Sequence, residues 1–246
     1  MGEANFCVYD KLNIAVEEAY KVLRTNIQFT GVDKQIKTIT IASYNPQEGK
    51  TTISINLAIS MARAGLKVLL VDADLRKPMT MKRLGSAVNT GLSNYIAGYA
   101  TIEDVLNRTN VENLYYIACG PKPTNPSELI ASYAFTNFLK LMEEQFDMII
   151  IDTPPLGSVI DCAIVAAQTD GTLLVIGANE IEYQNAKSMK EQLEKVNANI
   201  LGVILNKLDK GVYRNYCNYN NLYSKEKQMN KNWFKSMKEG RKASVL

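Results

Sequence analysis

The chain alternates short apolar segments with longer amphipathic segments, and this alternation constrains its fold more than any other feature of the sequence. The apolar segments are rich in β-branched residues and have the length of buried strands, whereas the others repeat apolar residues at helical spacing. Strands that alternate with helices in this way form a parallel sheet covered by helices on both faces. We therefore predict an α/β fold. The expected strands are 37–43, 67–73, 114–119, 147–152, 172–178 and 200–206, and the expected helices are 16–29, 51–65, 125–146, 159–168 and 183–198.

The length of 246 residues allows one large domain of this type with short extensions. We expect an N-terminal segment with a helix at 1–35, a core domain at 36–209 and a tail at 210–246, because the apolar periodicity stops after Leu208. No apolar run approaches the roughly 18 residues of a membrane span, and the N-terminus lacks the basic and apolar regions of a secretory signal. The sequence therefore predicts a cytoplasmic protein that reaches a membrane only through a partner.

A phosphate-binding motif lies between the first strand of the expected core and the helix that follows it. Gly49, Lys50 and Thr51 match the end of a P-loop. In such a loop, backbone N–H groups surround phosphate oxygens, the lysine reaches the β- and γ-phosphates, and the hydroxyl binds Mg²⁺. Tyr44 stands where the pattern has its first glycine. The strand before the motif and the helix after it supply the context that a P-loop requires.

Carboxylates end two further strands of the expected sheet. Asp72 and Asp74 lie in LLVDADLR, and Asp152 ends the apolar run MIIID. Ligands of parallel sheets collect at the carboxyl ends of the strands, so these side chains are expected beside the phosphate-binding loop. A strand that delivers Asp152 to this edge is the Walker B arrangement for the metal of a nucleotide. A single strand-terminal Asp is often a turn former, but three motifs at strand ends predict a nucleotide-phosphate site.

The chain contains no histidine. This excludes nucleophilic pairs that depend on imidazole, metal sites built on histidine, and the His-Arg-Asp catalytic loop of eukaryotic-type protein kinases. The 4 cysteines are far apart in sequence, which argues against a zinc site or a disulfide framework. Acid–base chemistry must therefore fall to carboxylates, lysine or tyrosine.

These motifs resemble those of the bacterial protein-tyrosine kinases (BY-kinases) of capsule and exopolysaccharide synthesis, a P-loop family. The resemblance covers most of the chain, from about residue 17 to a tyrosine cluster near the C-terminus. It implies a P-loop NTPase-like parallel sheet with helices on both faces and a flexible tyrosine-rich C-terminal tail. The motifs that carry it are PQEGKTT (Walker A), LLVDADLRKP (Walker A′), IIIDTPP (Walker B), EEAYKVLRTN and NPSELIAS.

The P-loop motif and the resemblance together imply ATP and Mg²⁺ as cofactors and assign roles to the site residues. Asp72 is, by resemblance, the candidate base that deprotonates the attacking tyrosine hydroxyl, although spacing alone does not decide between Asp72 and Asp74. The metal is expected to contact the carboxylates through its waters, because Mg²⁺ dehydrates reluctantly. The predicted catalytic residues are Lys50, Asp72 and Asp74, the predicted nucleotide-binding residues are Pro46, Gln47, Glu48, Gly49, Lys50, Thr51, Thr52 and Asn206, and the predicted metal ligands are Thr51, Asp74 and Asp152.

Two positions depart from the family pattern. The family has glycine after Pro46, where this chain has Gln47, and the change removes one permissive backbone position. The subunit-contact helix of the family reads Glu-x-x-Arg-x-x-Arg, but here it has Glu18, Lys21 and Arg24. Lysine keeps the charge and loses the bidentate fork of arginine. By resemblance we expect a homo-oligomer, a ring, with a weaker contact at Lys21.

Two short features leave alternatives open. Residues 206–209 spell NKLD, the guanine-reading pattern of GTPases, whereas the resemblance places Asn206 near adenine and favours ATP. Arg76 fits a contact to phosphate or to a neighbouring subunit as well as it fits a surface salt bridge.

A tyrosine cluster occupies the start of the tail, and by resemblance it is autophosphorylated in trans by a neighbouring subunit. The alternatives are an aggregation-prone interaction segment and stacking on single-stranded nucleic acid; no nucleic-acid partner is expected. Residues 224–246 hold seven of the 28 basic and two of the 25 acidic residues. Each phosphotyrosine adds about −1.5 to −2 charge, so phosphorylation would reverse the sign of the charge there. The tyrosines of the cluster are Tyr213, Tyr216, Tyr219 and Tyr223.

The leading functional hypothesis is an ATP-dependent protein-tyrosine autokinase that regulates capsular or exopolysaccharide synthesis and export. By resemblance, its partners are protein tyrosine substrates and the cytosolic tail of a transmembrane modulator, which holds it at the inner face of the plasma membrane. The alternative is a ParA/MinD-type ATPase, but such proteins have a signature lysine where this chain has Asn45. A pseudo-enzyme scaffold is disfavoured because the P-loop lysine and the three carboxylates are all present.

Overall fold

The computed structural model describes residues 12–30, 35–77 and 90–208. The chain divides into two units, Met1–Asn206 and Lys207–Leu246, and the fold below belongs to the first unit. The predicted tail at 210–246, with its tyrosine cluster, lies outside the described residues. The predicted boundaries at 1–35, 36–209 and 210–246 stay predictions.

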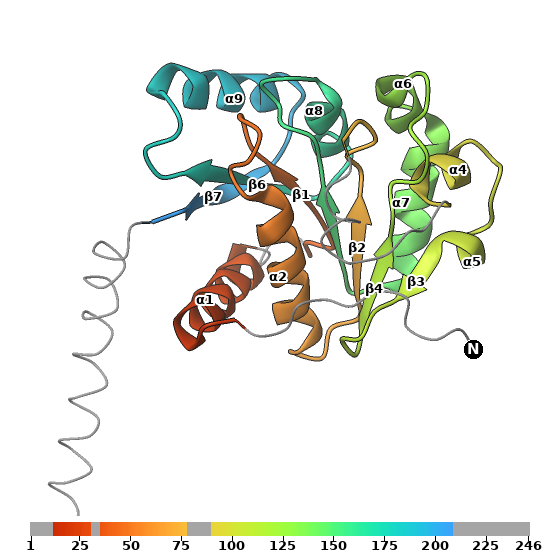
Figure 1. Ribbon diagram of the computed structural model, residues 1–246, viewed down its shortest axis with the longest axis horizontal. Coiled ribbons are helices and arrows are strands. Elements are labelled where there is room, and N and C mark those ends of the chain that lie inside the picture. Colours follow the sequence, from red (N-terminus) through yellow and green to blue (C-terminus); the bar gives the residue numbers. More distant parts are fainter. Residues whose placement is uncertain (1–11, 31–34, 78–89, 209–246) are drawn as a thin grey trace, which may run out of the picture. The chain divides into compact units, whose positions relative to one another are not determined.

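The core of the fold is a seven-stranded sheet (Figure 1). Its strands are β1 Thr38–Ala42, β2 Val68–Asp72, β3 Leu106–Arg108, β4 Leu114–Ile117, β5 Met148–Asp152, β6 Gly171–Gly177 and β7 Ile200–Asn206. They lie in the order β3-β4-β2-β5-β1-β6-β7. Every neighbouring pair is parallel except β3 and β4, which are antiparallel. The predicted α/β fold is confirmed, with an antiparallel edge strand that the sequence did not predict.

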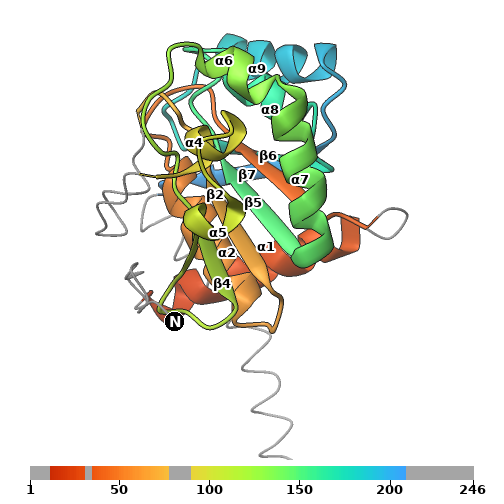
Figure 2. The same ribbon diagram turned by 90° about the vertical axis from the view of Figure 1, so that its right-hand side faces the viewer.

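Helices cover both faces of this sheet. They are α1 Ile14–Thr30, α2 Lys50–Ala62, α4 Leu92–Ile96, α5 Ile102–Val105, α6 Pro126–Ile130, α7 Tyr133–Gln145, α8 Asp161–Ala166 and α9 Tyr183–Lys195. Buried residues of α1 and α2 pack with Leu70 on one face, and those of α4, α6 and α7 pack with Leu69 on the other. Figure 1 shows the sheet between α2 and α7, and Figure 2 shows α7 running along its face. Among these described helices, none is both long enough and apolar enough to cross a membrane.

The carboxyl ends of the parallel strands meet at one edge of the sheet. The register pairs Asp72 of β2 with Asp152 of β5, and it pairs Asp152 with Ile41 of β1. The strands β1, β2 and β5 have five residues each, and all of these residues are buried, as expected for strands that are covered on both faces. The helix α2 begins at the same edge with Lys50. The sheet therefore brings the three predicted strand-end motifs together.

The helix predicted at 125–146 is in fact two helices. α6 ends at Ile130 and α7 begins at Tyr133. Between them, Ser132 accepts a hydrogen bond at Oγ from the backbone N–H of Phe135 at 3.3 Å and donates from Oγ to the carbonyl of Leu129 at 2.7 Å. One hydroxyl thus serves the end of one helix and the start of the next. The prediction of a continuous helix was wrong because apolar periodicity carries across such a break.

The Ser132 cap makes a stability prediction. Ser132→Ala removes the acceptor of the Phe135 N–H and is expected to lower the free energy of unfolding by about 1 kcal/mol. Ser132→Thr keeps a hydroxyl that can cap and should cost only a fraction of that amount. Urea denaturation followed by circular dichroism measures both variants. Equal losses for alanine and threonine would contradict the capping role.

Candidate active site

The loop between β1 and α2 folds around its own polar groups. Ser43 Oγ donates to the carbonyl of Asn45 at 2.8 Å, and the backbone N–H of Asn45 donates to the carboxylate of Glu48 at 2.9 Å. The Glu48 side chain is fully buried. Asn206, at the end of β7, donates from Nδ2 to the Glu48 carbonyl at 2.9 Å. Two predicted nucleotide-binding residues, Glu48 and Asn206, therefore shape the loop itself.

The backbone of this loop enters the left-handed region twice. Gly49 has a φ of 100°, and a Cβ at this position would lie 2.1 Å from Nδ2 of Asn206. Only glycine therefore fits beside Asn206. Gln47 has a φ of 67° at the position where the family pattern has glycine. A residue with a Cβ loses roughly 1–2 kcal/mol of stability in this region. The loop therefore keeps the left-handed backbone that glycine would favour at position 47, and Gln47 adopts it with strain.

Lys50 is the first residue of α2 and is 7% exposed. Its Nζ donates to Ser43 Oγ at 2.7 Å. Burial lowers the pKa of Lys50, and the negative charge of Asp152 opposes this shift without cancelling it. The ammonium is thus buried beside the loop with incomplete compensation of its charge. An anion placed at this helix N-terminus would supply the missing compensation.

The carboxylate of Asp152 lies close to the start of α2. Its side chain is almost fully buried, and its Oδ1 accepts a hydrogen bond from Ser54 Oγ at 3.1 Å. The same hydroxyl lies 3.0 Å from the carbonyl oxygen of Lys50. Ser54 was not predicted as a site residue, because a serine inside a helix carries no signal in the sequence. It connects the Walker B carboxylate to the P-loop helix.

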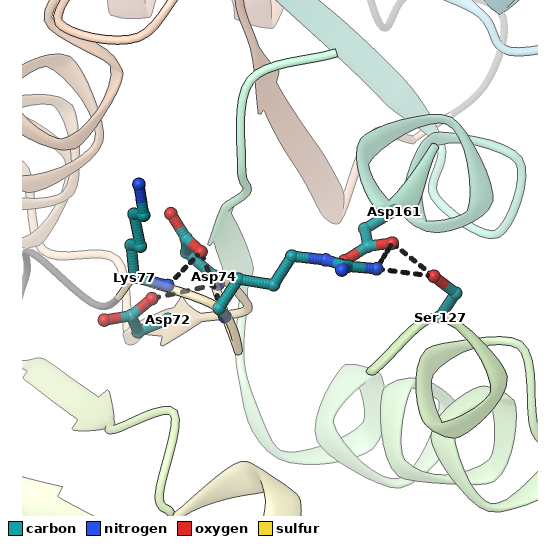
Figure 3. A network of polar contacts seen from close by, with 6 residues as sticks. Asp72, Asp74, Lys77, Ser127 and Asp161 are labelled. Carbon is teal, nitrogen blue, oxygen red and sulfur yellow. Dashed lines mark hydrogen bonds and ion pairs between the residues drawn. The ribbon is translucent and has the colours of Figure 1, made fainter. Parts of the chain in front are cut away.

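Asp72 is the last residue of β2, and Asp74 follows it in the segment after the strand (Figure 3). The fully buried Asp72 accepts a hydrogen bond at Oδ1 from the backbone N–H of Asp74 at 3.1 Å. Asp74, which is partly buried, accepts at Oδ1 from the N–H groups of Arg76 and Lys77 at 3.2 and 2.9 Å. Each carboxylate thus orders the residues that follow it. The two predicted catalytic carboxylates belong to one hydrogen-bonded segment.

Arg76 extends from this segment to α6 and α8. Its Nε and Nη2 donate to the two carboxylate oxygens of Asp161 at 2.7 and 3.0 Å. Nη2 also lies 2.9 Å from Ser127 Oγ, which donates to Asp161 at 2.6 Å. Figure 3 shows Asp161 and Ser127 side by side at the far end of this network. Of the interpretations left open for Arg76, the structure supports an ion pair, although its partner is buried rather than at the surface.

The loop also contacts the residues that follow β5, which the sequence did not indicate. The backbone N–H groups of Leu156 and Gly157 donate to the carbonyls of Ser43 and Tyr44 at 2.8 and 2.9 Å. A Cβ on Gly157 would lie 2.9 Å from Cε1 of the Tyr44 ring. The ring therefore packs on the glycine backbone. This contact explains how the P-loop accommodates tyrosine where the pattern has its first glycine.

The groups at this edge fit a nucleotide with magnesium. Carboxylates and hydroxyls are the hard oxygen ligands that Mg²⁺ prefers, and Lys50 with the N-terminus of α2 suits phosphate. In the described parts of the chain, no three or more acidic, Cys or His side chains cluster to hold a metal by themselves. The predicted ligands Thr51, at the first turn of α2, Asp74 and Asp152 could hold the metal together with the nucleotide's own oxygens.

Known proteins are similar to this chain in sequence and in structure. A family model described as an AAA domain matches residues 36–207. The tyrosine-protein kinase CpsD of Streptococcus agalactiae is 41% identical, over 86% of this chain and 93% of that protein. The chain belongs to the bacterial tyrosine-protein kinases. The tyrosine-protein kinase YwqD of Bacillus subtilis, which is 38% identical over 77% of this kinase and 80% of its own length, agrees with this assignment.

Solved structures lead to the same family. The chimerical protein CapA2B2 is 33% identical to this kinase with a TM-score of 0.77, covering 85% of this chain and 95% of that one. The kinase domain of the Escherichia coli tyrosine kinase ETK is 32% identical with a TM-score of 0.76, covering 79% and 76%. The septum site-determining protein MinD of Pyrococcus horikoshii, complexed with Mg-ADP, is more distant. It is 26% identical with a TM-score of 0.60, covering 73% of this chain and 76% of that one. The predicted family and enzyme class are confirmed, whereas the individual roles of the site residues stay predictions.

Gln47 gives a prediction about the strained turn. Gln47→Gly removes the Cβ that the left-handed backbone disfavours and is expected to raise the free energy of unfolding by about 0.5–1 kcal/mol. Gln47→Ala is the matched control, because it shortens the side chain and keeps the Cβ. Chemical denaturation of both variants checks the prediction. If alanine stabilises this kinase as much as glycine does, the strain at φ is not the cause.

Lys50 gives a prediction with a pH dependence. Its pKa in the folded protein lies below the ordinary 10.5, so the charged form costs stability at neutral pH. Lys50→Met removes this cost and should raise the melting temperature of the nucleotide-free protein at pH 7, by about 2–4 °C for each kcal/mol removed, while abolishing MgATP binding. As the pH rises through the pKa of Lys50 in the folded protein toward 10.5, the wild-type lysine loses its proton. The loss of stability caused by burying its charge then disappears.

Thermal melts at pH 7 and pH 10, with calorimetric titration of MgATP, measure both effects. The difference in melting temperature between the variant and the wild type should shrink at pH 10. A Lys50→Met protein that melts below the wild type at pH 7 would contradict the interpretation that the buried ammonium lowers the stability of the nucleotide-free protein and is there to bind phosphate.

Proposed function

We propose that this kinase transfers the γ-phosphoryl group of ATP to tyrosines of the C-terminal cluster, Tyr213, Tyr216, Tyr219 and Tyr223, on a neighbouring copy of the chain. The observation that carries the proposal is the register that places Asp72 beside Asp152, at the edge where α2 begins with the buried Lys50. Phosphoryl transfer depends mainly on positioning and on neutralisation of charge. A buried ammonium, a helix N-terminus and strand-end carboxylates meet both needs.

The proposed roles follow the chemistry of the transfer. Lys50 and the backbone N–H groups of residues 47–52 hold the phosphates. Asn206 supports the loop and lies near the adenine. Mg²⁺, when bound, neutralises charge on the β- and γ-phosphate oxygens. Asp72 accepts the proton of the tyrosine hydroxyl as the tyrosine oxygen bonds to phosphorus and the bond to the ADP oxygen breaks. Asp74 and Asp152, with Thr51, hold the metal.

The proposed oligomer is a ring formed through α1. Glu18 and Lys21 form an exposed pair at 2.6 Å on this helix, so both are accessible to a neighbouring copy. Arg24 donates to the carbonyl of Ser60 in α2 at 2.6 Å, which fixes α1 on the core. In such a ring, the tail of one copy reaches the site of the next. Phosphorylation of the cluster would then oppose the positive charge of 224–246 and weaken the docking of the tail.

The proposed setting is the inner face of the plasma membrane. There the kinase regulates capsular or exopolysaccharide synthesis and export, held by the cytosolic tail of a transmembrane modulator that activates it. The support for this setting is the resemblance of the Walker A, A′ and B motifs to the kinases of these pathways. Protein tyrosines are the substrates, and no nucleic-acid partner is proposed.

Two complementary variants test transfer in trans. A donor chain has the four cluster tyrosines replaced by phenylalanine and keeps its active site. An acceptor chain carries Lys50→Met and keeps its tyrosines. We expect phosphotyrosine in the acceptor after mixing with MgATP, and a loss of about a hundredfold or more when either chain is incubated alone. Mass spectrometry of the tail peptides locates the phosphate, with and without a modulator tail.

The outcomes of the mixing experiment separate the candidate functions. Phosphate that forms only when site and tyrosines belong to the same chain would overturn transfer in trans. Hydrolysis of ATP without phosphotyrosine under any condition would favour the ParA/MinD-type ATPase. Faster transfer with MgGTP than with MgATP would restore the guanine interpretation of residues 206–209.

A further inference from the structure

The segment of residues 72–77, called here the Walker A′ turn, carries two of the carboxylates proposed for the reaction. Its internal hydrogen bonds run from Asp72 to the N–H of Asp74, and from Asp74 to the N–H groups of Arg76 and Lys77. These bonds set the shape of the turn. The first two residues of the segment are placed directly, because Asp72 pairs with Asp152 in the register of β2 and β5 and the N–H of Ala73 donates to the Asp152 carbonyl at 2.8 Å. The internal bonds do not set the orientation of residues 74–77, because each of them joins residues within the segment. That orientation needs a further contact outside it.

The side chain of Arg76 provides that contact. Two of its nitrogens meet both oxygens of Asp161, a bidentate geometry that fixes the plane of the guanidinium as well as its distance. The Asp161 side chain is 1% exposed, whereas that of Arg76 is 34% exposed. A buried carboxylate requires a charged or hydrogen-bonding partner. Arg76 and Ser127 are the partners that the structure gives to Asp161.

Asp161 is joined to the other half of the site by the chain itself. It is the first residue of α8, the helix that follows β5 and its terminal Asp152. One ion pair thus links the segments that carry Asp72 and Asp74 to the segment that follows Asp152.

We propose that Arg76 is a positioning residue of the kinase reaction, which, through Asp161 and Ser127, holds residues 74–77 of the Walker A′ turn so that the carboxylate of Asp74 faces the site beside Asp72 and Asp152. Arg76 does not contact the reacting atoms in this role. Lysine would keep the charge at this position and lose the two-pronged contact. The proposal rests on the function proposed above, because it assumes that Asp72 and Asp74 serve phosphoryl transfer.

A structural role and a positioning role make different predictions for a double variant. Arg76→Gln alone leaves the carboxylate of Asp161 buried without its cation, and Asp161→Asn alone leaves the guanidinium without its anion. Each single variant should therefore lose stability. The combined Arg76→Gln, Asp161→Asn variant removes both charges and should recover most of the melting temperature. Activity should not recover with it, because two short amides do not reproduce the bidentate contact.

The experiment measures melting temperature and steady-state transfer of phosphate to the Lys50→Met acceptor chain described above. In both single variants and in the double variant we expect kcat to fall by about tenfold to a hundredfold. The KM for MgATP should stay within about twofold of the wild type, since the P-loop keeps its own contacts. Arg76→Lys should restore less than half of the lost kcat. Arg108→Gln, which removes an exposed arginine from the edge strand β3, is the matched control and should match the wild type.

Recovery of both stability and kcat in the double variant would overturn the proposal and leave Arg76 a structural ion pair. So would a kcat that stays at the wild-type value in Arg76→Gln, or full activity in Arg76→Lys. These results are distinct from failure of the proposed function. In that case the donor chain with Arg76 and Asp161 unchanged would form no phosphotyrosine on the acceptor, and the variants could not be compared.

Discussion

The arrangement of this site depends on two buried carboxylates at the ends of adjacent strands. Asp72 and Asp152 are partners in the register of parallel strands, and neither is appreciably exposed. Like charges so placed repel each other, and burial strengthens the repulsion because water no longer screens it. The compensation comes from the ammonium of Lys50, the hydroxyl of Ser54 and the backbone N–H of Asp74. A divalent cation at this edge would add to the same compensation, which is consistent with the proposed use of MgATP.

Much of the fold could be predicted from the sequence because the central strands are buried on both faces. Such strands are continuous apolar runs, and a following Asp marks where each one ends. The periodicity failed where a local hydrogen bond decides the structure, as at Ser132, which separates α6 from α7. It also failed at β3, whose three residues are too few and too polar to give a strand pattern.

The sequence predicted the site as a set of motifs. It did not predict the hydrogen bonds and ion pairs that join these motifs to one another. The ion pair of Arg76 with Asp161 joins residues 85 positions apart, and the bond of Ser127 to Asp161 spans 34. No spacing rule covers such distances. Ser127 lies inside the NPSELIAS segment, one of the motifs on which the resemblance was based, yet its residue type alone indicated nothing about its partner. The packing of Tyr44 on Gly157 likewise becomes visible only once the loops after β1 and β5 are seen together.

The order of the strands also affects how the chain reaches this structure during synthesis. β1 precedes every other strand in the sequence, but in the sheet it lies between β5 and β6, which are made late. The strand that leads into the P-loop therefore leaves the ribosome long before either of its neighbours exists. Contacts between segments so far apart form slowly, and unpaired apolar strands are prone to aggregate while they wait. A nascent chain thus gains a complete phosphate-binding edge only after Asn206, at the end of β7, has been translated, when nearly all of the described fold has already been made.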